Sequence, residues 1–287
     1  MQITQAKNLA CPLDGTALEF NNKQLVCANS HCFDIARQSY VNLLPVQFKK
    51  SKDPGDSKAM IVARGEFVSR GYFSNIADKL IEISHIHLAD RRDICLLDAG
   101  CGEGYFLNCI AQHYNNLDGG GQASFIGLDI SKWAIIAASK RTSCITWIVG
   151  TNKHIPVLPK SLDVIYSHFG FPIYEEFKKS LKPEGKIILT EAGPEHLIEL
   201  RNIIYPQLNT ARSKSSAVTE YTNLVDSCSL KYTITDMPQQ DIHNMLVMTP
   251  HLYRASKEGK EAAAKLDRMD LTIDITIKVL NFKPTFS

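Results

Sequence analysis

The stretch from residue 93 to residue 106 constrains the fold of this chain more than any other part of its sequence. It opens with an apolar run at residues 94–97, whose length and composition are typical of a strand buried in a parallel sheet. Asp98 follows, then three alternating glycines, then a helical pattern over residues 105–114. A glycine turn between strand and helix leaves bare backbone against which a ligand can lie, because no Cβ projects there. The stretch predicts a ligand-binding βα turn; the alternative is a glycine-rich turn that binds nothing.

The acid before the glycines indicates the charge of that ligand. The G-x-G-x-G spacing of Gly100, Gly102 and Gly104 is tighter than the G-x-G-x-x-G of dinucleotide sites. Asp98 would repel a pyrophosphate at the helix N-terminus, but it suits a ligand that carries an ammonium and a sulfonium. S-adenosylmethionine (SAM) is such a ligand. Backbone at Gly100 and Gly102 would approach its methionine part, and Asp98 would accept from its ammonium.

A second acid supports this interpretation. Residues 123–130 read as another buried strand, and Asp129 stands at its end. In doubly wound sheets an acid at this position can accept hydrogen bonds from both ribose hydroxyls. Ser131 is placed to cap the next helix, expected over residues 132–141. The order of strand, glycines, helix, strand, acid and helix resembles the class I SAM-dependent methyltransferases.

Composition excludes several classes of protein. The chain has 287 residues, a length that suggests about two domains, and a net charge of +2, too small to imply nucleic-acid binding by itself. It has no run of 18 apolar residues and no apolar signal core near Met1, so neither a membrane span nor secretion is expected. Its eight cysteines lie mostly in apolar segments, as buried thiols do in a reducing compartment. The sequence therefore predicts a cytoplasmic protein without membrane partners.

The first forty residues form a pattern of their own. Two turn-like knuckles, at residues 11–15 and 27–32, are separated by short strand-like pieces, as in a zinc ribbon. The expected ligands are Cys11, Asp14, Cys27 and His31, since aspartate can bind zinc through oxygen. Cys32 is a possible substitute. A unit this small buries little apolar surface, so a metal would supply stability; the alternative is that the metal has been lost and packing holds the knuckles.

A polar, lysine-rich segment follows the knuckles. Lys49, Lys50 and Lys52 precede turn-forming residues, which predicts an exposed loop. The loop is either a solvated linker or a surface that contacts RNA phosphates. Three units result: a ribbon with its basic loop at 1–58, connecting helices at 59–90, and a catalytic domain at 91–287.

The remaining sequence continues an α/β alternation. Further strands are expected at 144–149, 162–166 and 186–190, and a long helix is expected from 193 to 205. Residues 271–279 alternate strictly between apolar and polar, which indicates an antiparallel strand with one solvent-exposed face. The predicted fold class is thus α/β: a Rossmann-like, mostly parallel methyltransferase sheet whose last strand is antiparallel, with a small N-terminal zinc-ribbon-like domain.

Motifs along nearly the whole chain resemble the RlmA family of large-subunit (23S) rRNA guanine-N1 methyltransferases. They are Cys11-Pro-Leu, Cys27-x-x-x-His31, Phe33-Asp34, Tyr40-Val-Asn-Leu-Leu-Pro45, Asp53-Pro-Gly-Asp-Ser57, Leu97-Asp98-x-Gly-Cys-Gly-Glu103-Gly-Tyr105, Gly127-Leu-Asp-x-Ser-Lys132, Gly193-Pro-x-His196-Leu and Met248-Thr-Pro250 with Arg254. The resemblance implies a zinc-binding N-terminal domain, SAM as cofactor, and action as a dimer on an rRNA hairpin. Asp14 stands where the family has cysteine, which would weaken the zinc site.

The resemblance and the motif together define a cofactor set. Its members are Phe73, Asp98, Gly100, Gly102, Glu103, Asp129 and His196. Phe73 and His196 enter by resemblance alone, lining the pocket from outside the sheet. The alternative for Phe73 is simple core packing, and for His196 it is helix capping.

No catalytic residue follows from the sequence. Guanine N1 is protonated at neutral pH, so a base near the end of the fourth strand would help. Ser167, His168 and Glu191 lie in that region without a distinguishing pattern. The segment lacks both the Asn/Asp-Pro-Pro-Tyr pattern of amine methylation and the Pro-Cys of cytosine-C5 methylation, since Ile173 follows Pro172.

The leading hypothesis is therefore N1-methylation of a guanine in large-subunit rRNA. A small-molecule methyltransferase is one alternative, disfavoured because a small substrate needs no RNA-binding module. An rRNA-binding factor without catalysis is the other, disfavoured by the intact glycine turn.

Overall fold

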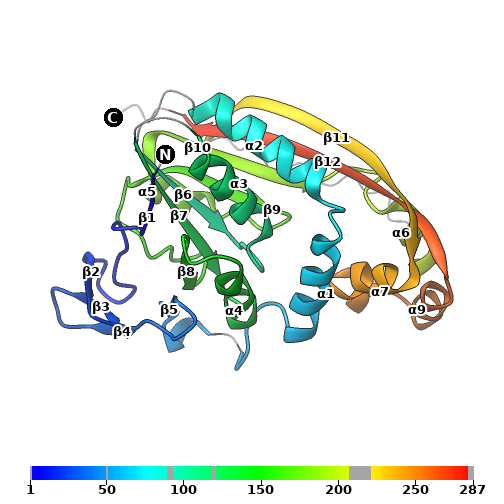
Figure 1. The fold of residues 1–287 in the computed structure, drawn as a ribbon, viewed down its shortest axis with the longest axis horizontal. Coiled ribbons are helices and arrows are strands. Elements are labelled where there is room, and N and C mark those ends of the chain that lie inside the picture. Colours follow the sequence, from blue (N-terminus) through cyan, green and yellow to red (C-terminus); the bar gives the residue numbers. More distant parts are fainter. Residues whose placement is uncertain (1, 50, 89–92, 118–120, 207–220, 284–287) are drawn as a thin grey trace.

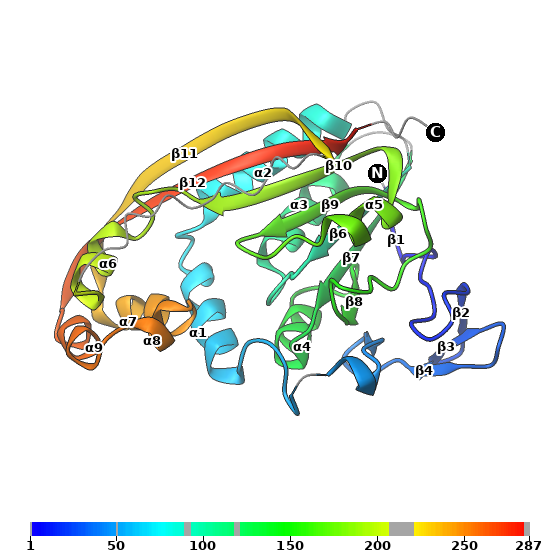
Figure 2. The ribbon, with the colours of Figure 1, turned by 180° about the vertical axis from the view of Figure 1, so that it is seen from behind.

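One large sheet organises the molecule (Figures 1 and 2). The computed structural model describes residues 2–49, 51–88, 93–117, 121–206 and 221–283. Over these residues the strand order is β11-β12-β10-β9-β6-β7-β8-β5, with β1 beside the start of β7. The central strands are parallel, β12 runs antiparallel to β10, and β11 runs antiparallel to β12. This confirms a mostly parallel sheet with an antiparallel last strand.

The bounds of the elements are as follows. The strands are β1 (Gln2–Thr4), β2 (Leu18–Asn21), β3 (Gln24–Cys27), β4 (Cys32–Asp34), β5 (Tyr40–Asn42), β6 (Ile94–Ala99), β7 (Gln122–Asp129), β8 (Thr146–Val149), β9 (Leu162–His168), β10 (Leu181–Ala192), β11 (Thr222–Pro238) and β12 (Arg268–Phe282). The helices are η1 (Val46–Phe48), α1 (Lys58–Ser69), α2 (Ser74–Leu88), α3 (Tyr105–Asn115), α4 (Lys132–Arg141), α5 (Tyr174–Ser180), α6 (Ile198–Ile204), α7 (Gln239–Val247), α8 (His251–Arg254) and α9 (Lys257–Ala264). Among them, no helix is long and apolar enough to cross a membrane.

Local sequence signals account for several of these elements. The helix expected over 132–141 is present as α4, and the Ser131 side chain accepts a hydrogen bond from the backbone of Ala134, as an N-cap does. The helix expected from residue 193 is shorter and begins only at Ile198. The reason lies in β12, whose backbone carbonyls accept hydrogen bonds from the amides of Gly193 and Leu197. The first five residues of that segment are held against the sheet instead of turning into helix.

The longest strand, β11, was not predicted from sequence. It pairs with β12 along most of its length, yet most of its side chains are exposed. Edge strands of this kind bury little on either face, so their residues need not alternate between apolar and polar. The signal that identified β12 is therefore absent from β11.

Alternating side chains divide the core into two clusters, one on each face of the sheet. Leu96, Phe125, Trp147 and Val164 belong to one cluster, together with apolar residues of α1, α2, α3 and α7. The next residue along each of these strands belongs to the other cluster: Leu97, Ile126, Ile148 and Ile165. Strands buried on both faces explain why these segments read as continuous apolar runs.

The N-terminal unit packs onto the second face of the sheet. Its three-stranded sheet β2-β3-β4 contributes Leu18, Leu25 and Cys27 to the same cluster as Leu97 and Ile148. Residues 150–161, between β8 and β9, form turns and isolated β-bridges. One of these is an antiparallel β-bridge between Leu9 and Val157. Figure 2 shows β2, β3 and β4 beside β8 and β1. The N-terminal unit therefore covers sheet surface that no helix from that connection covers.

Because of this packing, the N-terminal unit contributes to the free energy of unfolding of the whole protein. Leu9 is 3% exposed, whereas Leu13, a few residues away, is 50% exposed. We expect Leu9→Ala to lower the free energy of unfolding by about 2–4 kcal/mol, because it leaves a cavity between the unit and the sheet. Leu13→Ala should change it by less than about 0.5 kcal/mol. Denaturant unfolding followed by tryptophan fluorescence measures both; an unchanged main transition in Leu9→Ala would mean that the unit unfolds on its own.

Candidate cofactor cavity and metal centre

A cavity of about 620 Å³ opens at the carboxyl ends of the central strands. Its walls come from the ends of β6, β7, β9 and β10, from α1, and from residues 245–251. All seven residues of the predicted cofactor set line it: Phe73, Asp98, Gly100, Gly102, Glu103, Asp129 and His196. The structure thus brings together residues that lie up to 123 positions apart in the chain.

Gly100 and Gly104 of the turn differ in the space around the position that a Cβ would take. Gly100 has a φ of +92°, and a Cβ there would have no heavy atom closer than 3.9 Å, so its backbone faces open cavity. Gly104 has a φ of +80°, and a Cβ there would lie 2.5 Å from the Trp147 ring. Positive φ favours glycine at both positions. Gly104 therefore allows close packing, whereas Gly100 leaves room for a ligand.

Asp129 holds the turn in place. One of its carboxylate oxygens accepts a hydrogen bond from the Gly102 amide at 2.9 Å, and the other accepts one from the Ser131 amide at 2.7 Å. Burial raises the pKa of Asp129, while these two hydrogen bonds act in the opposite direction. Each carboxylate oxygen has a second lone pair, so the side chain can still accept from a ligand.

Asp98 is a buried polar group of the cavity that the protein leaves partly unsatisfied. It is 1% exposed, and its Oδ1 has no hydrogen-bond partner among the described residues. Burial raises its pKa well above the usual range, and the neighbouring carboxyls of Asp129 and Glu103 add to this effect. A cationic group beside Asp98 would satisfy the oxygen and stabilise the carboxylate. The unpartnered atom therefore fits a ligand with an ammonium, such as SAM.

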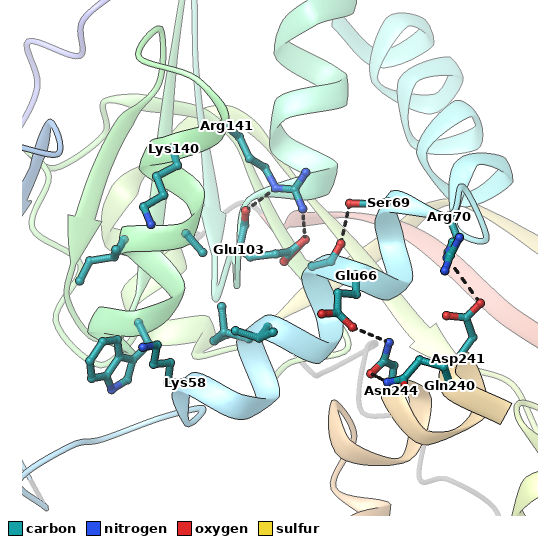
Figure 3. A pocket seen from close by; sticks show the side chains of 16 residues that line it. Lys58, Glu66, Ser69, Arg70, Glu103, Lys140, Arg141, Gln240, Asp241 and Asn244 are labelled. Atoms are coloured by element: carbon teal, nitrogen blue, oxygen red, sulfur yellow. Dashed lines mark hydrogen bonds and ion pairs between the residues drawn. The ribbon is translucent and has the colours of Figure 1, made fainter.

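Glu103 is tied to α4 on the outer side of the turn. Its backbone carbonyl accepts from Arg141 Nε at 2.9 Å, and its carboxylate lies 3.5 Å from Arg141 Nη2 (Figure 3). Burial raises the pKa of Glu103, and the charges of Arg141 and Arg64 oppose that shift. The side chain borders both this cavity and a neighbouring groove.

Phe73 and His196 close the cavity from outside the sheet. The Phe73 ring stacks on Phe106 with centroids 6.2 Å apart. His196 Nδ1 accepts a hydrogen bond from the Asp274 amide at 3.3 Å, and its ring stacks on Phe169. Burial lowers the pKa of His196 to about 4, so the ring is neutral at pH 7 and its proton is on Nε2. No side chain caps α6, so helix capping does not explain His196.

Arg64, on α1, is a cavity residue that the sequence motifs did not identify. Its guanidinium donates to the Asp56 carboxylate at 2.6 Å and to the Met248 carbonyl at 3.0 Å. It thereby joins α1 to the segment after α7 at the edge of the cavity. The partner carbonyl is 184 residues away, so no local pattern could have indicated this contact.

The far half of the cavity, at the ends of β9 and β10, holds His168 and an aromatic loop. His168 Nδ1 lies 2.9 Å from the Thr190 hydroxyl, and its Nε2 is buried without a partner among the described residues. Burial lowers the pKa of His168 to about 3. Phe171, in the loop after β9, also lines the cavity and is 87% exposed. Ser167, also considered from sequence, is buried and does not line the cavity.

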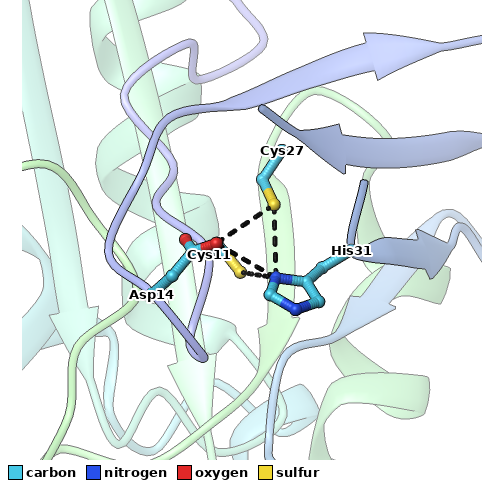
Figure 4. A group of neighbouring side chains, drawn as sticks. All are labelled: Cys11, Asp14, Cys27 and His31. Atoms are coloured by element: carbon cyan, nitrogen blue, oxygen red, sulfur yellow. Dashed lines mark hydrogen bonds and ion pairs between the residues drawn. The ribbon is translucent and has the colours of Figure 1, made fainter. Parts of the chain in front are cut away.

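A second cluster lies in the N-terminal unit (Figure 4). The side chains of Cys11, Asp14, Cys27 and His31 offer one ligand atom each, all within 4.8 Å of one another. His31 Nδ1 is 3.5 Å from the sulfur of Cys11 and 3.4 Å from that of Cys27. Zinc bonded tetrahedrally at 2.0–2.3 Å would separate its ligand atoms by about 3.3–3.8 Å. The donor set and its spacing fit one zinc ion, which this cluster could bind.

Asp14 enters the cluster through one oxygen. Its Oδ1 accepts from the amide and the hydroxyl of Thr16, at 2.9 and 2.7 Å. Its Oδ2 lies 3.0 Å from His31 Nδ1 and also accepts from Asn29. The hydrogen bond from the Thr16 hydroxyl, followed by that from Asn29, lowers the pKa of Asp14. Cys32 lies outside the cluster, since it is exposed and its thiol faces the Ser30 carbonyl.

Comparison with known proteins agrees with both sites. A family model described as the N-terminal domain of RlmA matches residues 9–52, and a methyltransferase domain model matches residues 96–185. A putative 23S rRNA (guanine-N(1)-)-methyltransferase of Bacillus subtilis is 31% identical over 277 residues, which cover 94% of this chain and 95% of that protein. The chain belongs to the RlmA family.

Two further RlmA relatives match a shorter part of the chain. A 23S rRNA (guanine(748)-N(1))-methyltransferase of Streptomyces fradiae is 26% identical over 70% of this chain and 69% of that protein. A putative 23S rRNA (guanine-N(1)-)-methyltransferase of Micromonospora griseorubida is 29% identical over 67% of this chain and 68% of that protein.

The oxygen ligand Asp14 should lower the zinc affinity of this RlmA member, and this can be tested. We expect zinc in protein purified without chelator and its loss on mild EDTA treatment, because a carboxylate is a harder ligand than a thiolate. Asp14→Cys should hold zinc more tightly, since it restores a soft ligand at the same spacing. Elemental analysis before and after EDTA measures this. Untreated protein with an ordered N-terminal unit and no zinc would show that packing alone holds the knuckles.

Proposed function

We propose that this protein transfers a methyl group from SAM to N1 of a guanine in a hairpin of large-subunit (23S) rRNA. The observation that carries the proposal is the unpartnered Asp98 oxygen beside the open glycine turn, in a chain that also has an RlmA-type N-terminal unit. The Bacillus subtilis relative, which matches along nearly its whole length, is named for the same reaction.

The cofactor would lie along the ends of β6 and β7. Asp98 would accept from its ammonium, the backbone of Gly100 and Gly102 would lie against its methionine part, and Asp129 would accept from the ribose. Glu103, Phe73 and His196 would complete the walls of this pocket. When bound, SAM supplies a methyl group activated by the positive sulfonium.

The target base would occupy the other half of the cavity. β6 and β9 are neighbours, and Asp98 pairs with Tyr166, so His168 lies only two residues beyond the strand position opposite Asp98. Guanine presents an N1–H donor and an O6 acceptor on one edge. The unpartnered Nε2 of a neutral His168 can hydrogen-bond to that edge, and the exposed Phe171 ring can stack on the base. The pKa of His168, about 3, makes it a weak base, so we assign it hydrogen bonding and name no general base.

The N-terminal unit favours RNA over a small molecule as the methyl acceptor. It is packed into the same hydrophobic cluster as the catalytic sheet, which would hold an RNA-binding surface at a fixed position relative to the cavity. A catalytically inactive binding factor would not need an open glycine turn lined by buried acids. We further propose that the protein acts as a homodimer in the cytoplasm, and that its functional units are residues 1–58, 59–90 and 91–287.

The methylation itself can be tested directly. Incubation with SAM and an unmodified 23S rRNA transcript should produce 1-methylguanosine, detected by mass spectrometry of the nucleosides. Ribosomal RNA from a strain that lacks the gene should lose that nucleoside. A different methylated nucleoside, or an unchanged profile in that strain, would contradict the proposal.

Asp98 should make cofactor binding depend on pH. Because burial raises its pKa, Asp98 in the free protein keeps a proton to a higher pH than an ordinary aspartate does, whereas a cationic ligand favours the carboxylate. The affinity for SAM should therefore rise as pH increases through the pKa of Asp98 and fall at lower pH. Asp98→Asn should bind weakly and lose this pH dependence.

Calorimetry at several pH values, in buffers of different ionisation enthalpy, measures both affinity and proton release. Asp93→Asn provides a matched control, because Asp93 precedes the opposite end of the same strand and is exposed. It should bind SAM as the wild type does. Equal pH dependence in Asp98→Asn and wild type would remove Asp98 from the cofactor site.

A further inference from the structure

A groove of about 850 Å³ lies between α1, α4 and α7, outside the cofactor cavity (Figure 3). Helix α1 separates the two spaces. Met60, Arg64 and Val68 line the cavity, whereas Ile61, Gly65 and Ser69 of the same helix line the groove. The groove therefore follows the back of the helix that closes the cofactor site, and Glu103 borders both.

The acids of the groove are already engaged by neighbouring groups. Glu103 pairs with Arg141. Asp241, which is 1% exposed, accepts from the Tyr72 hydroxyl at 2.8 Å and lies 3.7 Å from Arg70 Nε. Glu66 accepts from the Asn244 amide at 3.0 Å (Figure 3).

Two lysines of the groove, by contrast, have no acid partner. In the part of the chain that the structure describes, no carboxylate lies within 4.0 Å of Lys58 or Lys140. Lys58 is the first residue of α1, where the helix dipole adds positive potential. It also follows the lysine-rich loop of Lys49 and Lys52; Lys50 lies outside the described residues.

An exposed indole lines the same groove and lies beside Lys58. Trp133 is 37% exposed on α4, and Lys58 Nζ stands 5.5 Å from the centre of its ring. Val62, 51% exposed, lines the same groove. An aromatic ring beside unpaired cations is the combination that binds single-stranded nucleic acid, through base stacking and phosphate contacts.

We propose that this groove binds a single-stranded RNA segment that flanks the methylated hairpin, with phosphates at Lys58 and Lys140 and a base on Trp133. The assignment rests on the proposed function as an rRNA methyltransferase. A protein partner without acidic side chains at both lysines fits less well, because it would bury two lysine charges without a counter-charge, whereas RNA brings its own phosphates. Bound RNA would contact the helix that closes the cofactor site.

The test compares two pairs of lysines. One variant carries Lys58→Ala and Lys140→Ala. Its control carries Lys260→Ala on α9 and Lys265→Ala at the C-cap of that helix, which removes the same charge elsewhere. Binding of a hairpin with a single-stranded flank is measured against salt concentration. The slope of log affinity against log salt is negative. Its magnitude should decrease by about 1.4 for the groove variant, since each single-strand phosphate contact contributes about 0.7. The control should keep the wild-type slope.

The stacking contact has its own pair of variants. Trp133→Ala should weaken RNA binding by roughly 5- to 100-fold, whereas Trp133→Phe keeps an aromatic face and should retain most of the affinity. All variants should bind SAM as the wild type does, which shows that the fold is intact. A hairpin that lacks the single-stranded flank should bind to the groove variants and to the wild type with equal affinity.

Three outcomes would overturn the assignment. Groove variants with wild-type slope and affinity would show that RNA does not enter the groove. An altered oligomeric state in analytical ultracentrifugation, with unchanged RNA binding, would show that a second copy of the chain occupies it. Wild-type protein that neither binds nor methylates the RNA would overturn the proposed function together with the groove.

Discussion

The Asp129 carboxylate holds together the part of the structure on which the rest depends. Its two hydrogen bonds to the amides of Gly102 and Ser131 join the glycine turn after β6 to the start of α4. The turn has positive φ angles that only glycine adopts without strain, so its shape needs an external anchor. With the turn fixed, Asp98 stays buried at the end of β6 and the backbone of Gly100 faces the cavity.

The cavity brings together carboxyl groups that the protein itself pairs only in part. Asp98 and Glu103 are buried and Asp129 is half-buried near them, and loss of solvent raises the pKa of each. Arg64 and Arg141 oppose the effect from α1 and α4, but no described group reaches Asp98 Oδ1. Buried carboxyls without partners destabilise a fold, and a positively charged ligand relieves this cost. Structure and chemistry therefore agree on a cationic cofactor.

Two physical effects act together in the N-terminal unit. The ligand atoms of Cys11, Asp14, Cys27 and His31 are positioned for one metal ion, while Leu9, Leu18 and Leu25 pack into the core of the catalytic sheet. The small unit thus does not depend on the metal alone for its stability. The metal would order the knuckles, and the packing would hold them at one place on the sheet. A fixed place suits a module that positions RNA for the neighbouring cavity.

Local patterns in the sequence determined the glycine turn, Asp98, Asp129, the cap at Ser131 and the four residues of the metal cluster. They did so because each depends on residues close together in the chain: a strand end, a turn, a cap, a pair of knuckles. The antiparallel pairing of β12 was also predicted from its alternation, but the expected solvent-exposed face was wrong, because Thr272 and Asp274 are buried. The polar edge strand β11 was not, because it buries too little to leave a pattern.

Only the tertiary structure decided how distant segments meet. Sheet order places His168 of β9 two residues beyond the position opposite Asp98 of β6, and helix packing joins Arg64 to the Met248 carbonyl. The same packing places Lys58 over Trp133 and leaves Lys140 in the groove without an acid partner among the described residues. It also sets the N-terminal unit on a face of the sheet where residues 150–161 form no helix. Such contacts depend on the order of strands and the direction of helices, which are properties of the whole folded chain and of no single segment.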